Sequence, residues 1–201
     1  MLSDKLKEMI RLNLSKEEAF TYGEKPSLDL VLANREKRVK IQDELCTQYP
    51  KKVIIAYKCN IPGEVKNNEV IQYIFNTGRE MLMESFKQYN WSCLYQEEFN
   101  EITGPELFIV VSEENVFEVK KVMIEIEQNS TLGRLLDVDV LYVSNAEVRS
   151  ISRTELGFEE RKCLLCEHSA KECGRARVHS IEHLHEKMRE FLVERGVYFN
   201  E

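Results

Sequence analysis

The spacing of apolar and polar residues predicts four strands and two helices in the middle of the chain. Strand-like segments rich in β-branched or alternating side chains are residues 53–61, 91–99, 107–111 and 136–143. Helical spacing marks residues 68–89 and 113–128. The order strand, helix, strand, strand, helix, strand is typical of the split βαβ arrangement, in which two helices cover one face of a sheet. We therefore predict an α+β fold with a ferredoxin-like or nucleotidyltransferase-palm-like sheet.

The segments before this core are predicted to be helical. Residues 1–26 form a polar, helix-prone extension, and Ser27 can cap a helix that Pro50 ends. The stripe expected to face the core in this helix consists of Leu28, Leu32, Arg35, Val39 and Gln42, with Val31 beside it. Arg35 and Gln42 are polar members of that stripe. They either face a ligand or extend from a partly buried helix to solvent.

The end of the chain is predicted to be a Cys- and Arg-rich tail, residues 144–201, that packs on the rest. It finishes in an amphipathic helix over residues 180–194, with Ile181, Leu184, Met188 and Leu192 on the apolar side. His183 and His185 lie beside that stripe and are expected to be exposed. Residues 27–201 are expected to form a single catalytic domain.

Composition narrows the class of protein. The chain has 201 residues, of which 43% are hydrophobic, and a net charge of −7. It contains no run of about 18 apolar residues, and its charged N-terminus lacks the apolar region of a secretory signal. We expect a cytoplasmic protein without a membrane or nucleic-acid surface. Residues 149–179 nevertheless carry seven basic and five acidic side chains. Such a local excess suits a compact polyanion, although ordinary solvated surface is the alternative.

The clearest chemistry lies in the paired aspartates. Asp137 and Asp139 are alternate residues of a predicted strand, so both point to one face while Val138 and Val140 point into the core. Two neighbouring carboxylates repel each other unless a cation lies between them, and Mg²⁺ prefers carboxylate oxygens. The pair predicts a Mg²⁺ (or Mn²⁺) site for phosphoryl or nucleotidyl transfer. The polar face of an edge strand is the alternative interpretation.

Basic residues around this pair are candidates for binding phosphate. Arg134 directly precedes the aspartates, and its planar guanidinium matches phosphate geometry, while Gly133 permits close approach of the backbone. Further candidates are Arg153, Arg175, Arg177 and, in the loop after the first core strand, Lys66. Arg175 and Arg177 precede a helix that Ser180 can cap, and a helix N-terminus favours anions. Surface charge near a helix cap is the alternative.

The cysteines of the tail are a possible zinc set. Cys163, Cys166, Cys173 and His179 supply three thiolates and one imidazole within seventeen residues, and the first pair has the spacing of structural zinc sites. The second half of the set is shorter than common zinc-finger spacings, so the match is partial, and packing of small buried cysteines remains open. If zinc is bound, four protein ligands leave no position for water, and the site is structural.

Several blocks of the sequence together resemble a known family. They are residues 35–42, 60–66, 103–106, 133–140, 151–158, 161–166, 170–173 and 175–180. Over residues 28–195 the chain is similar to the citrate lyase holo-acyl-carrier-protein synthase family, also described as apo-citrate lyase phosphoribosyl-dephospho-CoA transferases. Two features depart from the family: residues 1–25 look like an addition, and Ser130-Thr131 stands where a His-Pro pair is expected.

The resemblance implies a specific reaction. The transferase would move phosphoribosyl-dephospho-CoA from 2′-(5″-triphosphoribosyl)-3′-dephospho-CoA to a serine of the apo acyl-carrier (gamma) subunit of citrate lyase, with release of pyrophosphate. The carrier of a related lyase is an alternative partner. A second hypothesis is a non-catalytic, zinc-stabilised module that binds an acyl-carrier or CoA protein. The aspartate pair favours the enzyme, because a binding module has no need to concentrate two carboxylates beside an arginine.

Overall fold

A five-stranded antiparallel sheet forms the centre of the structure, a computed structural model that describes residues 10–145 and 147–200. Its strands, in spatial order, are β3 (Cys93–Glu101), β4 (Gly104–Val111), β2 (Val53–Cys59), β5 (Leu136–Ser144) and β6 (Glu147–Ser150). β2 lies between β4 and β5, so two strand–helix–strand units interleave. The chain is an α+β protein, as predicted. β6 is an additional strand that its four exposed residues did not reveal in the sequence.

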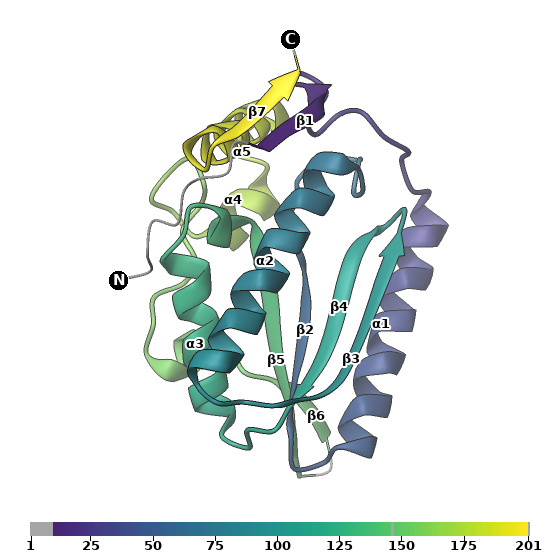
Figure 1. The fold of residues 1–201 in the computed structure, drawn as a ribbon, viewed down its shortest axis with the longest axis vertical. Coiled ribbons are helices and arrows are strands. Elements are labelled where there is room, and N and C mark those ends of the chain that lie inside the picture. Colours follow the sequence, from purple (N-terminus) through teal and green to yellow (C-terminus); the bar gives the residue numbers. More distant parts are fainter. Residues whose placement is uncertain (1–9, 146, 201) are drawn as a thin grey trace.

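Two helices, α2 (Glu69–Gln88) and α3 (Val116–Gln128), cover one face of this sheet (Figure 1). Each begins at an asparagine whose side-chain oxygen accepts backbone N–H groups of the first turn: Asn68 accepts from Ile71, and Asn115 from Phe117 and Glu118. Apolar residues of both helices are buried against alternate residues of the strands. The element order from β2 to β5 is the predicted one.

A third helix, α1 (Leu28–Gln48), covers the opposite face, next to β2 and β5. Ser27 caps it, as predicted, by accepting the N–H of Leu30 at 3.3 Å. The predicted apolar stripe, however, is wrong, because Leu28, Leu32 and Val39 are 71%, 45% and 55% exposed.

The buried face of α1 carries polar residues in its first half. Asn34 and Arg38 turn toward the sheet there, whereas Leu45 and Cys46 are buried further along. The sheet under the first half of α1 is itself polar, so the matching helix positions are polar too. Apolar periodicity could not identify this face. Arg35, which had been assigned to it, is exposed.

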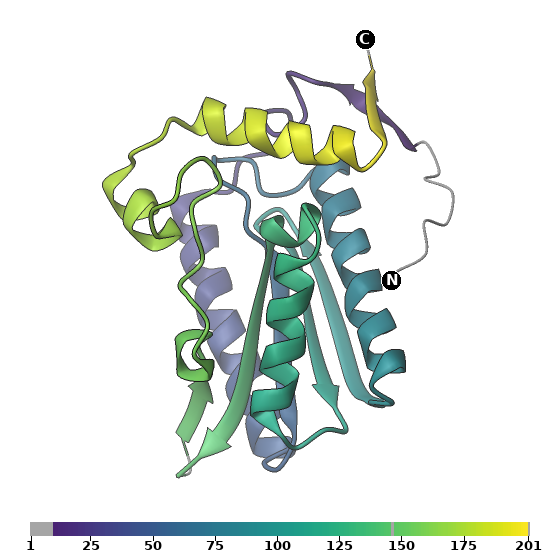
Figure 2. The same cartoon turned by 90° about the vertical axis from the view of Figure 1, so that its left-hand side faces the viewer.

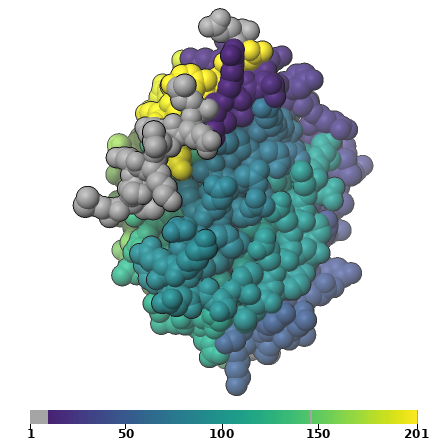
Figure 3. Space-filling view, in the orientation of Figure 1, coloured from purple at the N-terminus to yellow at the C-terminus, as the bar shows by residue number. Residues whose placement is uncertain are grey.

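The N-terminal extension is also not the predicted helix where the structure describes it. Residues Ile10–Ser15 form β1, which pairs in parallel with β7 (Val197–Asn200) at the C-terminus. β1 and β7 lie against each other at one end of the molecule (Figure 3). Leu12 is 5% exposed and Phe20 is 1% exposed, so the segment contributes to the main core.

The tail runs along the side of these layers and then across their end. It contains η2 (Thr154–Leu156), α4 (Ala170–Ala176) and α5 (Ile181–Glu194), and the last of these lies across the end of the sheet (Figure 2). A short 3-10 helix, η1 (Leu132–Leu135), connects α3 to β5. No helix in the described part of the chain is both long and apolar enough to span a membrane.

His185 of α5 corrects a prediction. His183 is exposed as expected, but His185 is only 4% exposed, and its Nε2 lies 2.9 Å from the carbonyl oxygen of Pro62. The loop after β2 passes over α5 at Gly63, which has φ +96° and comes so close that a Cβ would lie 3.1 Å from the His185 ring. The imidazole is therefore buried by a loop far away in the sequence.

Candidate active site

The two aspartates of β5 lie on the sheet face that α1 covers. Val138 and Val140, which alternate with them, are buried against α2 and α3. The side chains of Asp137 and Asp139 are 39% and 43% exposed. This alternation is the predicted one, and it leaves both carboxylates accessible on one small polar patch.

A row of charged residues crosses the three central strands at the level of Asp137. Lys58 of β2 is paired in register with Glu106 of β4 on one side and with Asp137 on the other. Residues paired across neighbouring strands project to the same face, so all three side chains face α1. The Nζ of Lys58 lies 3.4 Å from the Asp137 carboxylate.

Helix α1 adds a cation and an amide above this row. Arg38 Nη1 lies 2.8 Å from the Glu106 carboxylate, and Arg38 Nη2 lies 3.8 Å from Asp139. Asn34 Nδ2 also donates to Glu106, at 3.0 Å. Glu106 is 6% exposed, and the carboxylate is therefore buried but paired.

Arg38, Asn34, Glu106 and Lys58 are not among the site residues predicted from the sequence. Arg38 lies in block 35–42 and Glu106 in block 103–106, two of the blocks on which the family resemblance rested. Membership of these blocks was the only indication in the sequence that the two residues belong to the site. Nothing in the local pattern of either block indicates that the two residues meet.

The electrostatics of the pair fit a divalent cation. Burial, and then the neighbouring Asp137, raise the pKa of Asp139, while Lys58, Lys120 and Arg38 oppose the rise. Asp137 therefore lies close enough to disfavour ionisation of Asp139. A hard cation between the carboxylates would relieve this repulsion, and both are accessible enough to bind one.

The predicted phosphate-binding arginines fall into two groups, neither of which contacts the aspartates. Arg134 Nη2 donates to the carbonyl oxygens of Lys162, at 2.8 Å, and Cys163, at 3.2 Å. Arg153 pairs with Glu127 at 2.6 Å, and both arginines line a cavity of about 160 Å³ beside α3. Arg175 lies in α4 and Arg177 ends it, and both are exposed.

The two remaining substrate-binding candidates are also held by local contacts. Lys66 Nζ donates to the carbonyl oxygen of Ile61 at 2.7 Å, and burial, followed by repulsion from Lys58, lowers the pKa of Lys66. Lys66 is thus electrostatically coupled to the row of charges on the sheet. Gly133 is buried where η1 meets α3, and a Cβ there would lie 2.9 Å from the Glu127 carbonyl oxygen. The close backbone contact that the sequence predicted for Gly133 is thus made with α3.

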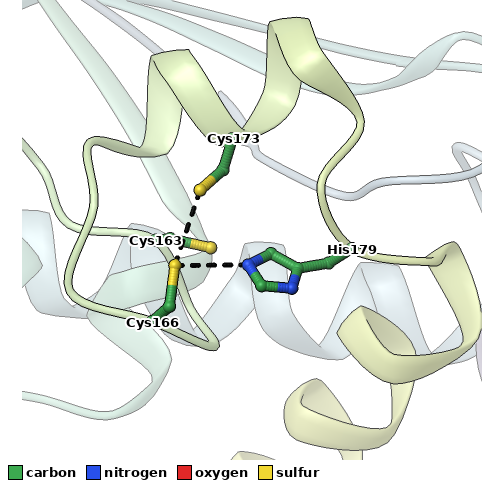
Figure 4. A group of neighbouring side chains, drawn as sticks. All are labelled: Cys163, Cys166, Cys173 and His179. Atoms are coloured by element: carbon green, nitrogen blue, oxygen red, sulfur yellow. Dashed lines mark hydrogen bonds between the residues drawn. The ribbon is translucent and has the colours of Figure 1, made fainter.

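The predicted zinc residues do converge on one point. The ligand atoms of Cys163, Cys166, Cys173 and His179 all lie within 4.8 Å of one another (Figure 4). Cys166 Sγ lies 3.5 Å from Cys173 Sγ and 3.2 Å from His179 Nε2. The edge of a tetrahedron with zinc–sulfur bonds of about 2.3 Å is about 3.8 Å. The cluster could therefore hold a metal ion.

The thiols of this cluster are electrostatically unequal. Burial alone would raise the pKa of Cys163, but hydrogen bonds from the backbone N–H groups of Leu165 and Cys166 bring that pKa below its ordinary value. Burial and the neighbouring thiols raise the pKa of Cys173 to about 12. Three thiols this close cannot all ionise without a cation, which is the role that a bound metal would have.

Comparison with known proteins identifies the family. A model of the family described as apo-citrate lyase phosphoribosyl-dephospho-CoA transferase matches residues 26–195. The chain is 40% identical over 163 residues to "Protein CitXG" of Leuconostoc mesenteroides subsp. cremoris, with 81% of the chain but 34% of that relative covered. The chain therefore spans about a third of the length of that relative.

Two further relatives match over most of their own length. A probable apo-citrate lyase phosphoribosyl-dephospho-CoA transferase of Vibrio cholerae is 35% identical, with 82% of this chain and 90% of the relative covered. One with the same description from Streptococcus pyogenes is 34% identical, with 83% of this chain and 85% of the relative covered.

These matches define the class as a group transferase, so the alternative of a non-catalytic binding module does not hold. The chain belongs to the apo-citrate lyase phosphoribosyl-dephospho-CoA transferase family.

Proposed function

We propose that this chain transfers the phosphoribosyl-dephospho-CoA unit from 2′-(5″-triphosphoribosyl)-3′-dephospho-CoA to a serine of the apo acyl-carrier (gamma) subunit of citrate lyase. Membership of the family supports the reaction. The observation that carries the proposal is the carboxylate pair on a partly exposed face with Lys58 and Arg38 beside it. That arrangement suits a polyphosphate substrate with a divalent cation.

The chemistry is a substitution at phosphorus. The serine hydroxyl loses its proton to solvent and its oxygen forms a bond to the α-phosphorus of the triphosphate. The bond from that phosphorus to the bridging oxygen breaks, and pyrophosphate leaves. Asp137 and Asp139 would hold Mg²⁺ or Mn²⁺, which would offset negative charge on the phosphate oxygens. Lys58 and Arg38 would help to neutralise the same charge. The antiparallel sheet with two helices on one face is compatible with a ferredoxin-like, palm-like assignment.

The other basic candidates would contact the distal phosphates or the leaving pyrophosphate. Lys66 and the segment at Gly133 and Arg134 adjoin the ends of β2 and β5. Arg175 and Arg177 are exposed and free to approach a ligand or the acidic surface of a partner. We place the reaction in the cytoplasm and take residues 27–201 as one catalytic domain. No nucleic acid or membrane enters this function.

The Cys–His cluster would hold a structural zinc ion. Three thiols and one imidazole are a complete tetrahedral set. The N–H groups that donate to Cys163 are the kind of outer contacts that fix a metal-bound thiolate. The segment so fixed supplies the carbonyl oxygens that Arg134 binds. Zinc would thereby stabilise the tail next to the start of β5.

The direct test is transfer itself. The purified chain is incubated with apo carrier protein, the triphosphate precursor and Mg²⁺, and intact mass should show one added prosthetic group per carrier. Asp137→Asn and Asp139→Asn should each lower the rate by about a hundredfold or more, since each removes a carboxylate from the cation site. Asp43→Asn, on the exposed side of α1, is the matched control and should transfer normally. Near-normal rates in both site variants would remove the aspartates from the mechanism.

A further inference from the structure

The outer edge of β5 is not completed by a strand where it carries the aspartates. β6 pairs with β5 only from Leu141 to Ser144. On the other side, β2 pairs with β5 from Leu136 to Leu141. In the part of the chain that the structure describes, residues 136–140 thus have a strand on one edge alone. Unpaired backbone groups on such an edge need other partners.

Side chains of α3 supply these partners at the residue between the two aspartates. The N–H of Val138 donates to Glu127 Oε1 at 3.4 Å, and Lys120 Nζ donates to the carbonyl oxygen of Val138 at 3.0 Å. The carbonyl groups of Leu136 and Val140, which also point away from β2, accept hydrogen bonds as well. Arg161 donates to the Leu136 carbonyl oxygen at 2.8 Å, and the N–H of Ile151 donates to the Val140 carbonyl oxygen at 3.0 Å.

Both α3 side chains are buried charges. Glu127 is 6% exposed and Lys120 is 8% exposed. Glu127 Oε2 is paired with Arg153 at 2.6 Å and lies 3.5 Å from Arg161. Buried ion pairs seldom add stability over apolar residues of similar size, so their use calls for a reason other than stability. The reason suggested by their position is that they act on one peptide.

We propose that Glu127 and Lys120 are positioning residues, which fix the backbone of Val138 and thereby the separation and orientation of the Asp137 and Asp139 carboxylates. Arg153 holds Glu127 in place, as does Arg161. The inference rests on the proposed function, because the geometry is worth fixing only if the two carboxylates share a cation. Mg²⁺ demands near-ideal octahedral geometry, and functional groups must be held to within about 0.5 Å.

In this role Arg153 binds Glu127, whereas the sequence predicted that it binds phosphate. The two roles predict different kinetics. A positioning arginine acts through Glu127 on the aspartates, so its loss weakens cation binding and, at a saturating concentration of the cation, leaves affinity for the precursor unchanged. An arginine that touches phosphate has the opposite effect. Arg153→Ala therefore separates the two roles, and it is a milder change than substitution of Glu127, because Arg161 lies 3.5 Å from Glu127 and still pairs with that carboxylate.

The experiment compares Glu127→Gln, Lys120→Met and Arg153→Ala with three matched controls. The controls are Glu118→Gln and Lys121→Met, on the exposed side of α3, and Arg149→Ala, on β6. Mn²⁺ affinity is measured by electron paramagnetic resonance, and hydrogen exchange of the Val138 amide by nuclear magnetic resonance. Both readouts are independent of turnover, and Arg153→Ala covers the case in which a buried variant fails to fold.

We expect the Kd for Mn²⁺ to rise about tenfold in the folded variants, as for other residues that orient metal ligands, with normal values in the controls. The Val138 amide should exchange faster in Glu127→Gln, and KM for the precursor should stay within about twofold of wild type. Unchanged Mn²⁺ affinity, or a higher precursor KM in Arg153→Ala with normal Mn²⁺ affinity, would overturn the inference.

Failure of the proposed function looks different. Wild-type protein that binds Mn²⁺ through Asp137 and Asp139 but modifies no carrier would overturn the reaction and leave the positioning role intact. A wild type whose Mn²⁺ binding is unaffected by loss of either aspartate would overturn both.

Discussion

At the scale of single residues, the buried pair of Arg38 and Glu106 brings one cation, the Arg38 guanidinium, close to Asp139. The guanidinium of Arg38 lies 2.8 Å from Glu106 and 3.8 Å from Asp139. The shorter contact keeps the arginine partly away from the aspartate pair. Because both partners are largely buried, the loss of either leaves an uncompensated charge.

Replacement of Glu106 should therefore affect both stability and cation binding. We expect Glu106→Ala to lower the free energy of unfolding by about 3 kcal/mol. The released Arg38 can then turn to Asp139 and compete with Mg²⁺, so more Mg²⁺ should be needed for half-maximal transfer. Urea unfolding and a Mg²⁺ titration of the rate measure the two effects.

Glu101→Ala is the matched control for this change. Glu101 of β3 pairs at 3.7 Å with Lys37 of α1, the helix that also carries Arg38. Both side chains are exposed, so the expected loss in the free energy of unfolding is below about 1 kcal/mol. Equal losses in the two variants would show that the burial of Glu106 has no special effect.

The residue scale also shows what the sequence could and could not predict. The aspartates were identifiable because a spacing of two on a strand places side chains on one face. Arg38 and Glu106 are 68 positions apart, and only the packing of α1 on β4 brings them together. The same holds for Arg153 and Glu127, which are 26 positions apart. Charge in the sequence predicted a phosphate contact for Arg153, whereas in the structure this arginine is paired with Glu127.

At the scale of elements, strands and helices with regular apolar spacing were predicted closely. β2, α2, β5 and α5 begin and end within two residues of the predicted positions. The bounds of α1 were also right, but its buried face was not, because the sheet beneath its first half is polar. β1 was missed although Ile10, Leu12 and Leu14 alternate with polar residues and pack on the main core, because the charged, polar composition of residues 1–26 was interpreted as a helix-prone extension.

The element that depends most on a ligand is the cysteine segment between η2 and α5. Protein purified without a histidine tag should contain about one zinc per chain. Cys166→Ser should lose that zinc, whereas Cys93→Ser, an exposed cysteine of β3, should retain it. Chelation should lower the melting temperature, and residues 161–180 should lose protection from hydrogen exchange first, since metal binding there contributes directly to folding. Metal-free protein with full activity and three readily alkylated thiols would reduce the cluster to packing.

At the scale of the whole molecule, β1 and β7 form a small sheet that the family match does not include. β1 and β7 lie outside residues 26–195, yet they pair with each other, and Leu12 and Val197 are buried in the main core. The backbone N–H and the side-chain amide of Asn13 also donate hydrogen bonds to Glu69 at the start of α2. This sheet lies with α2 and α5, while the aspartates lie on the face of α1. Its contribution should therefore be to stability rather than to the reaction.

Leu12→Ala tests this division between stability and activity. Removal of a side chain that is 5% exposed should lower the free energy of unfolding by about 2 to 4 kcal/mol, because burial is lost and a cavity remains. The transfer rate at 25 °C should stay within about twofold of wild type as long as the protein is folded. Arg11→Ala, at the exposed neighbouring position of β1, should change neither quantity. A Leu12→Ala protein of normal stability would show that β1 lies on the core without supporting it. A folded variant with a greatly reduced rate would instead couple the terminal sheet to the site through α2, which contacts both β1 and the central strands.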